Sequence, residues 1–508
     1  MESLRELISL ITQKRIKKVE LFDESNRNKT SNYFRLFEGI HSRRYTTDAE
    51  AAQDIYECLP SEKKYLILKT RLRQKLLNTL FFLDYDSDNS AEYQKILYDC
   101  NKQVYAIKVL MMSNTRRLAI PMAEKTLRLA ADYQLTDIVL ECARILREHY
   151  SGNNYQEFLE YKDIAERTEH QQRVENQAEQ FYQEIVAVYA KSKGNRPRVK
   201  KMAEKYYRAI ESNFRPYDSI KLRLNYYRIK TLFFQLSDNY REAIAVLTEH
   251  EEFISQTPSF HPPSRTEELA IQKMNFYLHL KAFEEGEAHA KQFASLFADK
   301  NLNLYTFKEY QLLLAMHTGH YLRASEIFHE VVGQSTFRTL SDAKKERWAT
   351  FQAYLHYIYK YQKVKEIRPL IQNSKTGFQL NDFLEKRPEF AKEKRGLNSA
   401  IMIIQILFFL EKMNMEALVD RVNEIEKYTR RYPKKDMNFR SECFISLLTQ
   451  MRDDGFRFYQ TRRATEKVYE ELNSVMMEYY GGNRALEVLP YEVMWDIVLD
   501  KLKDYKYG

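Results

Sequence analysis

A three-residue pattern that returns four times constrains the fold of this 508-residue chain more than any other feature. Each copy has a large apolar residue, a small or apolar residue three positions on, and another apolar residue seven positions on. Because helical side chains three and four residues apart share a face, each copy predicts one packed helix, and a small middle residue lets a second helix approach closely. The copies are Tyr240, Ala243 and Leu247; Phe283, Gly286 and Ala290; Tyr321, Ala324 and Phe328; and Val364, Ile367 and Ile371.

The spacing of the copies predicts stacked helical hairpins. They begin 43, 38 and 43 residues apart, and a period of about forty residues is the scale of helical repeat units. Only 12 Gly and 11 Pro interrupt a chain that is 30% charged and 44% apolar, which favours long helices with short polar turns over a sheet protein. We predict an all-α solenoid of about eight antiparallel hairpins, because a chain of this length is too long for one growing core.

The chain is predicted to divide into three parts. Residues 1–85 form an N-terminal helical domain, residues 86–195 form the first hairpins, and residues 196–508 form an irregular repeat array. The boundaries follow polar interruptions at 84–90 and 191–197.

Hydrophobic periodicity predicts the individual helices. Residues 155–190 fit either one extended helix or two helices with a tight bend, and the sequence leaves both open. The other predicted helices cover about 3–21, 32–40, 48–58, 61–83, 91–112, 115–133, 138–150, 220–236, 240–253, 267–280, 283–297, 305–316, 321–332, 347–361, 364–371, 398–410 and 415–428, with two or three more after 433.

Two of the hairpins resemble tetratricopeptide repeats. Gly319, Tyr321, Ala324 and Phe328 are similar to the turn and second helix of that repeat, and Asn239, Tyr240, Ala243 and Leu247 resemble the same piece. The resemblance implies a right-handed superhelix whose concave groove holds a peptide or helix of a partner protein. An N-terminal helical segment before an irregular array is also similar to large tetratricopeptide-containing bacterial proteins.

Charge and cysteine usage indicate the compartment. The 80 Lys and Arg are interleaved with 71 Asp and Glu, so the net charge of +9 permits attraction to an acidic partner without requiring one. The four cysteines are isolated in sequence, which favours buried thiols in a reducing cytoplasm. The richest apolar run, 400–410, is too short to span a bilayer, so we expect no membrane association.

The sequence offers no catalytic signature. It has no glycine-rich nucleotide loop. His317 and His320 could share a metal with Glu326 or His329, but they flank a predicted hairpin turn, where polar residues are expected. We therefore predict a non-enzymatic protein with no cofactor, metal or catalytic residue.

The sequence favours a scaffold that binds a protein or peptide. Tyr226 and Tyr227 are adjacent, which predicts that they do not both face inward, and exposed tyrosines often anchor a partner. Tyr226, Arg228, Tyr310 and Arg347 are predicted to line the groove. The oligomeric state stays open.

The alternative is a nucleic-acid-binding regulator. A basic helix ahead of a repeat array looks like the layout of peptide-sensing transcription regulators, with Lys64, Arg71, Arg73 and Lys75 as the contacts to nucleic acid. One observation opposes it. If 32–40 and 48–58 formed a helix-turn-helix, the second helix would bring its acidic residues toward the phosphates; these are Asp48, Glu50, Asp54 and Glu57.

Overall fold

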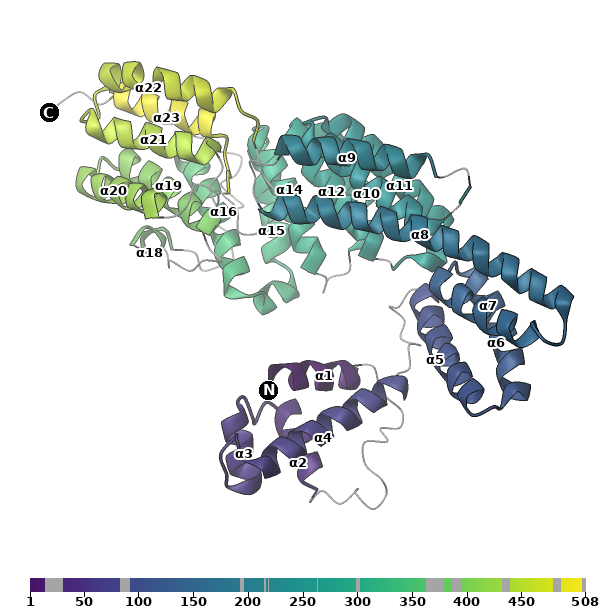
Figure 1. Cartoon of the computed structure of the whole chain (residues 1–508). Helices are drawn as coiled ribbons and strands as arrows, with labels where there is room; N and C mark the ends of the chain where they lie inside the picture. Colours follow the sequence, from purple (N-terminus) through teal and green to yellow (C-terminus); the bar gives the residue numbers. More distant parts are fainter. Residues whose placement is uncertain are drawn as a thin grey trace. The chain divides into compact units, whose positions relative to one another are not determined.

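The computed structural model is built of helices (Figure 1). Its described residues form 22 α-helices, a few short 3₁₀ turns and no strand, which confirms the all-α prediction for that part of the chain. The described residues are 1–13, 31–82, 92–191, 196–213, 216–217, 219–262, 264–297, 302–361, 379–385, 395–431, 439–477 and 486–504. None of the helices within these ranges has the length and apolar character needed to cross a bilayer.

The chain forms two compact units. The first contains Met1–Glu175 with Gln256–Pro263, and the second contains Asn176–Ser255 with Ser264–Gly508. The predicted boundaries at 84–90 and within 192–195 lie outside the described residues. The sequence left 155–190 open between one helix and two, and the structure has one continuous helix, α8 (Tyr155–Lys191).

The first unit begins with four helices that share a small core. On α4 an apolar stripe is buried, with Tyr65, Leu68, Leu72 and Leu76 all at most 3% exposed. A second core lies between the hairpin helices that follow, and it contains Cys100 and Cys142. The helices are α1 (Glu2–Gln13), α2 (Asn32–His41), α3 (Asp48–Tyr56), α4 (Lys63–Thr79), α5 (Glu92–Met112), α6 (Arg116–Asp132) and α7 (Thr136–Tyr150).

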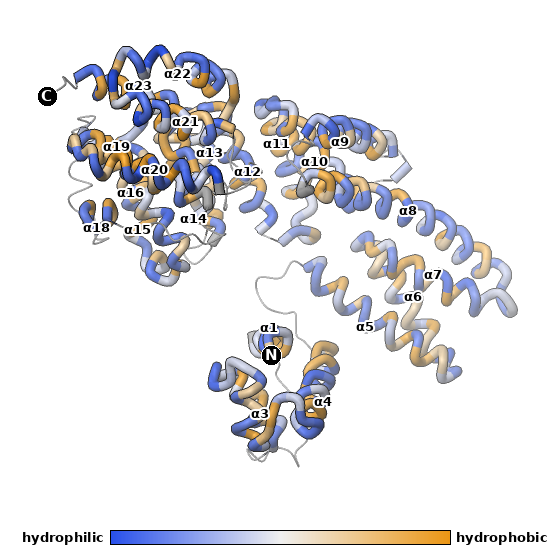
Figure 2. Tube along the Cα trace, turned by 60° about the vertical axis from the view of Figure 1, so that its left-hand side comes forward, coloured by the Kyte–Doolittle hydropathy of each residue, from blue (hydrophilic) through white to orange (hydrophobic). Residues whose placement is uncertain are grey.

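The second unit is a series of helices joined mostly by short turns. One continuous apolar core runs from α12 to α23. Within that core α19 is hydrophobic along most of its length (Figure 2), because it is covered on nearly every side. The helices are α9 (Arg196–Glu211), α10 (Ile220–Leu236), α11 (Tyr240–Gln256), α12 (Ser264–Leu280), α13 (Phe283–Gln292), α14 (Leu302–His317), α15 (Tyr321–Val332), α16 (Asp342–Tyr361), α18 (Leu380–Glu385), α19 (Arg395–Glu411), α20 (Met415–Arg431), α21 (Phe439–Asp453), α22 (Phe458–Asn473) and α23 (Tyr491–Asp504).

Seven of the turns share one geometry. In each, a left-handed residue ends the first helix, and the next backbone N–H donates to the carbonyl five residues earlier, as in a Schellman cap. The left-handed residues are Asn114, Gln134, Asp238, Lys281, Gly319, Met413 and Gly455. The matching bonds are Thr115 to Leu110, Leu135 to Ala130, Asn239 to Phe234, Ala282 to Tyr277, His320 to Ala315, Asn414 to Phe409 and Phe456 to Met451, at 2.8–3.0 Å.

The repeated sequence pattern marks the second helix of three such hairpins. Its small middle residues are buried, with Ala243 and Ala324 both 0% exposed, as expected for close helix approach. Many neighbouring helices are in contact, including α12 with α14 and α14 with α15. This packing is compatible with a helical repeat. The fourth copy of the pattern, 364–371, lies outside the described residues.

The thiols and most large aromatic side chains belong to the cores. All four cysteines are free and buried, as predicted. Burial raises the pKa of Cys100 to about 11 and that of Cys142 to about 12, so both thiols are protonated at neutral pH. Trp348 and Trp495 are among the largest fully buried side chains.

A substitution at Gly286, in the second copy of the repeated pattern, tests how closely the helices approach there. A Cβ built there lies 2.3 Å from Cδ2 of Leu314, which is 0% exposed. We predict that Gly286→Ala lowers the free energy of unfolding by about 1 kcal/mol, because overpacking outweighs the gain in helix propensity. Urea unfolding measures it. Gly152→Ala is the control, since nothing lies within 4 Å of that Cβ; equal or higher stability of Gly286→Ala would contradict the close packing.

Candidate functional site

A non-helical segment before the last helix is the most unusual feature of the second unit. We call Leu486–Pro490 the strap. All five of its residues are buried, and Leu486, Glu487, Val488 and Leu489 are each at most 2% exposed. Because a buried backbone outside a helix needs partners for its polar groups, other elements must supply them.

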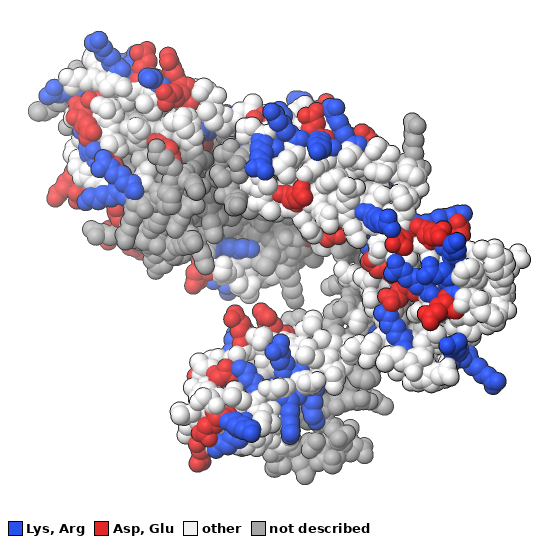
Figure 3. Space-filling model, viewed as in Figure 1, with Lys and Arg blue, Asp and Glu red and all other residues white. Residues whose placement is uncertain are grey.

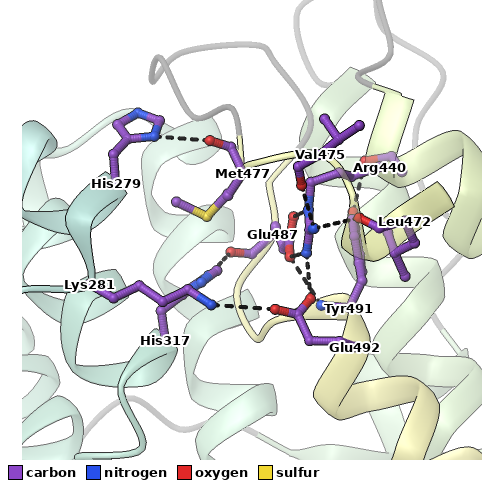
Figure 4. Close-up of polar contacts among 11 residues, drawn as sticks. His279, Lys281, His317, Arg440, Leu472, Val475, Met477, Glu487, Tyr491 and Glu492 are labelled. Atoms are coloured by element: carbon purple, nitrogen blue, oxygen red, sulfur yellow. Dashed lines mark hydrogen bonds and ion pairs between the residues drawn. The ribbon is translucent and has the colours of Figure 1, made fainter. Parts of the chain in front are cut away.

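Arg440 of α21 holds the carboxylate of the strap (Figure 4). Its Nε donates to Oε2 of Glu487 at 3.0 Å and its second terminal nitrogen to Oε1 at 2.7 Å, so the ion pair is bidentate. The other terminal nitrogen donates to the carbonyls of Leu472 and Val475, both at 2.9 Å. Arg440 also contacts the carboxylate of Glu492. A guanidinium that is 5% exposed is thereby fully engaged.

Two helix ends from the middle of the chain complete the clamp. His317, at the end of α14, donates from Nε2 to the Glu487 carbonyl at 2.7 Å. His279 of α12 contacts the Met477 carbonyl through Nδ1 at 2.9 Å. Lys281 in the following turn pairs with Glu492 at 3.3 Å. These four side chains contact Met477, Glu487 or Glu492, and we call Arg440, His317, Lys281 and His279 the clamp.

The Glu487 carboxylate also fixes the start of α23. Oε1 of Glu487 accepts the backbone N–H of Tyr491 at 3.0 Å, and the Tyr491 hydroxyl lies 2.8 Å from Oγ of Ser441. The inward face of α23 is buried, with Met494 at 0% and Trp495 at 1% exposure. The strap and the last helix thus form one held element.

Burial and charge set the protonation states in the clamp. Burial by itself would lower the pKa of Arg440, but the carboxylates of Glu487 and Glu492 raise it above its ordinary value. Burial would raise the pKa of Glu492, but Arg440 and Lys281 hold it below its ordinary value. Burial lowers the pKa of His317, so its imidazole is neutral at pH 7. The clamp therefore offers two cations, Arg440 and Lys281, and a neutral donor at His317.

This arrangement can bind a carboxylate and backbone carbonyls. No three His, Cys, Asp or Glu residues are grouped to hold a metal in the described part of the chain. An open cleft of about 390 Å³ lies elsewhere in the second unit. Its lining includes Arg421, which pairs with Glu424 at 2.7 Å.

The histidines considered for a metal are engaged separately. His317 is in the clamp, while the ring of His320 stacks on Phe283 and its Nδ1 lies 2.9 Å from the Thr318 hydroxyl. His329 contacts the Ser325 carbonyl through Nδ1 at 2.7 Å.

The prediction that Tyr226 and Tyr227 do not both face inward is wrong. They are 5% and 9% exposed. The reason is that α10 is covered on two faces: the Tyr226 ring meets Tyr207 of α9, and the Tyr227 ring stacks on His250 of α11. Tyr226 also donates to Glu211 at 2.8 Å.

The other residues predicted for the groove are also tied into the packing. Arg228 lies over the Tyr182 ring of α8 at 5.5 Å. Tyr310 is 6% exposed. Arg347 pairs with Glu309 at 2.8 Å, with 12% of its side chain exposed.

The four residues predicted to contact nucleic acid all lie on α4. Two of them have local partners and two are exposed. Lys64 donates to the Tyr56 carbonyl at 3.0 Å, and Lys75 lies over the Tyr33 ring at 5.3 Å. Arg71 and Arg73 are exposed, and neither has a partner among the described residues.

The acidic residues of α3 are used inside the first unit. Asp48 accepts from the Tyr65 hydroxyl at 2.7 Å and pairs with Lys69 at 2.8 Å. Asp54 pairs with Arg44 at 2.7 Å and accepts from the Tyr45 hydroxyl. Glu50 completes a capping box with Thr47.

Sequence reasoning missed the strap and its clamp. The available signal was weak: a charged Glu487 inside an otherwise apolar run, and Arg440 at the start of a helix whose apolar residues begin at Cys443. Nothing in the sequence links these two residues to a histidine at 317.

Comparisons with family models, curated proteins and solved structures found no match to this chain. The function is therefore argued from the geometry alone.

Arg440 is predicted to be critical for stability. Arg440→Ala leaves the Glu487 carboxylate buried without its cation, which lowers the free energy of unfolding by about 3–5 kcal/mol. Arg462→Ala, at an exposed site on the neighbouring α22, serves as the control and costs less than about 0.5 kcal/mol. Denaturant unfolding of the full chain measures both. The double variant Arg440→Met with Glu487→Met recovers part of the loss; a loss as small as that of Arg462→Ala would refute the clamp.

Histidine 317 makes stability depend on pH. Its pKa is lowered in the folded chain, so between its folded and unfolded pKa values the unfolded chain binds more protons. The contribution is complete above about pH 6.5 and is lost as the pH falls, by up to about 1.4 kcal/mol per pH unit. His317→Gln keeps a donor at the Nε2 position and is predicted to remove this pH-dependent contribution to stability. Unfolding free energies at pH 7, 6 and 5 test it, and equal slopes in both proteins would rule it out.

Proposed function

We propose that this chain is a non-enzymatic binding protein that holds extended segments of partner proteins against its stacked helices. In this proposal the second unit is a right-handed solenoid of the tetratricopeptide type, working in a bacterial cytoplasm. The turn geometry shared by five hairpins of this unit supports it, because stacked hairpins of one kind produce a continuous curved surface.

The strap is the single observation that carries the proposal. The second unit already holds a non-helical segment of its own chain with contacts suited to peptide recognition: a bidentate Arg on a carboxylate and a His on a backbone carbonyl. The groups come from α14 and α21, elements far apart in sequence. A surface that can do this for a segment in cis has the chemistry to do it for a segment in trans.

The contacts indicate which segments suit such a surface. The strap presents one acidic side chain, Glu487, between apolar residues, and Pro490 follows before the helix begins. A partner segment of the same chemistry would be acidic and apolar, with an extended stretch leading into an amphipathic helix.

A regulator that binds nucleic acid is the second candidate. The observation in its favour is the exposure of Arg71 and Arg73 without partners among the described residues. It is weaker because Lys64 and Lys75 are engaged locally.

Exchange of the strap tests the proposed function. A specific protease site is introduced at Gly481–Gly482, outside the described residues, and the folded full chain is cut there. We predict that the C-terminal fragment stays bound and that a fluorescent synthetic copy of it exchanges in, as followed by anisotropy. Arg440→Ala should weaken binding of the copy about 100-fold or more, because the ion pair is buried.

The control is Arg462→Ala, which should bind the copy as the unmodified chain does. If the cut chain keeps its helical circular dichroism but never binds the synthetic copy, the clamp is not a binding surface and the proposal fails.

A further inference from the structure

The outer face of α4 carries apolar side chains that the first unit leaves uncovered. Leu66 is 47% exposed, Ile67 39% and Leu77 43%. They lie on the side opposite the buried stripe of the same helix. Single exposed leucines are ordinary, but three on one helical face form a surface that gains free energy when it is covered.

Two arginines border this surface. At 3.6 residues per turn, Leu66, Ile67 and Leu77 fall on one side of the helix, and Arg71 and Arg73 fall on its two edges. Leu66 and Leu77 are eleven residues apart, so the stripe is about 16 Å long at 1.5 Å per residue. This matches about three turns of another helix laid alongside it.

The surface is cationic and contains no acidic residue. Between Lys63 and Phe82 the sequence has six Lys or Arg and no Asp or Glu. Among the acids of α3, Asp48 pairs with Lys69 and Asp54 with Arg44, while Glu50 accepts the backbone N–H groups of residues 46 and 47. Figure 3 shows Lys and Arg side chains gathered over these N-terminal helices. The positive charge of Arg71 and Arg73 is therefore left for a partner.

The combination of aliphatic, polar and basic side chains on this face favours one kind of acidic partner over the others. A nucleic-acid backbone would pair with the arginines but gain nothing from Leu66, Ile67 and Leu77. A bilayer would accept the aliphatic side chains, but the exposed Thr70 and Gln74 lie among them and would lose their hydrogen bonds in hydrocarbon. An acidic protein helix can bury the aliphatic groups, bond the polar ones and neutralise both arginines.

We propose that the outer face of α4 docks an acidic amphipathic helix of a partner protein. Leucine-like side chains of that helix cover Leu66, Ile67 and Leu77, and carboxylates on its two flanks pair with Arg71 and Arg73. This surface belongs to the first unit and is independent of the clamp in the second, so either can fail without the other.

A defined probe tests the proposal on the full chain. The probe is a fluorescent 18-residue synthetic helix with Leu at spacings of three and four on one face and Glu on the remainder. We expect anisotropy to report saturable binding. Leu66→Ser with Leu77→Ser should weaken it at least tenfold, as should Arg71→Glu with Arg73→Glu.

The controls separate specific docking from general charge. Arg462→Glu with Arg463→Glu makes the same change in net charge at exposed positions of α22 and should leave affinity within twofold. Arg71→Lys with Arg73→Lys should retain most of the binding. Circular dichroism checks that each variant is folded.

The other partners give distinct results, each of which would overturn the proposal. One is binding to 20-base-pair duplex DNA that falls steeply with salt and is unaffected by the serine substitutions. A second is tighter binding to vesicles containing phosphatidylserine than to the probe. A third is self-association in sedimentation velocity that the serine substitutions abolish. The fourth is absence of probe binding.

Discussion

The buried ion pair between Arg440 and Glu487 is the interaction on which the second unit depends. Both side chains are nearly inaccessible, so each would destabilise the fold if the other were absent. Together they hold a non-helical stretch of backbone against the helices of the second unit. The Glu487 carboxylate also accepts the backbone N–H at the start of α23, and the Glu487 carbonyl accepts a hydrogen bond from Nε2 of His317. The charge pair thus joins the strap to α21, and the His317 hydrogen bond joins it to the end of α14, 170 residues earlier.

Around this pair, the stack is built from one turn geometry used many times. A left-handed residue and a bond to the carbonyl five residues earlier end the first helix in each of five hairpins of the second unit. Small residues such as Ala243 and Ala324 then let the helices approach closely. Regular hairpins supply the surface, and the clamp shows the polar chemistry that such a surface can present to an extended segment. The outer face of α4 is a separate surface, on which exposed aliphatic side chains lie beside positively charged ones.

Helix positions could be predicted well because packing periodicity is local: the bounds of α10 and α15 match the predicted 220–236 and 321–332. The turns were harder to predict from the sequence, because glycine is the usual signal of a left-handed residue and only Gly319 and Gly455 among the seven are glycines. The prediction that Tyr226 and Tyr227 do not both face inward was wrong because α10 is covered on two sides. The sequence of one helix does not show how many neighbouring helices cover it. The clamp was beyond prediction because its residues meet only through the tertiary fold. The exposure of Leu66 and Leu77 also needed coordinates, as apolar residues in a helix are usually assigned to a core.

Hydrogen exchange in the full chain, with and without Glu487→Gln, tests the central claim most directly. If the clamp joins the end of the chain to the middle of the second unit, removing the carboxylate charge should speed exchange in the strap and also at the ends of α12 and α14, around Lys281 and His317. Faster exchange confined to residues 486–492, with the ends of α12 and α14 unchanged, would contradict it.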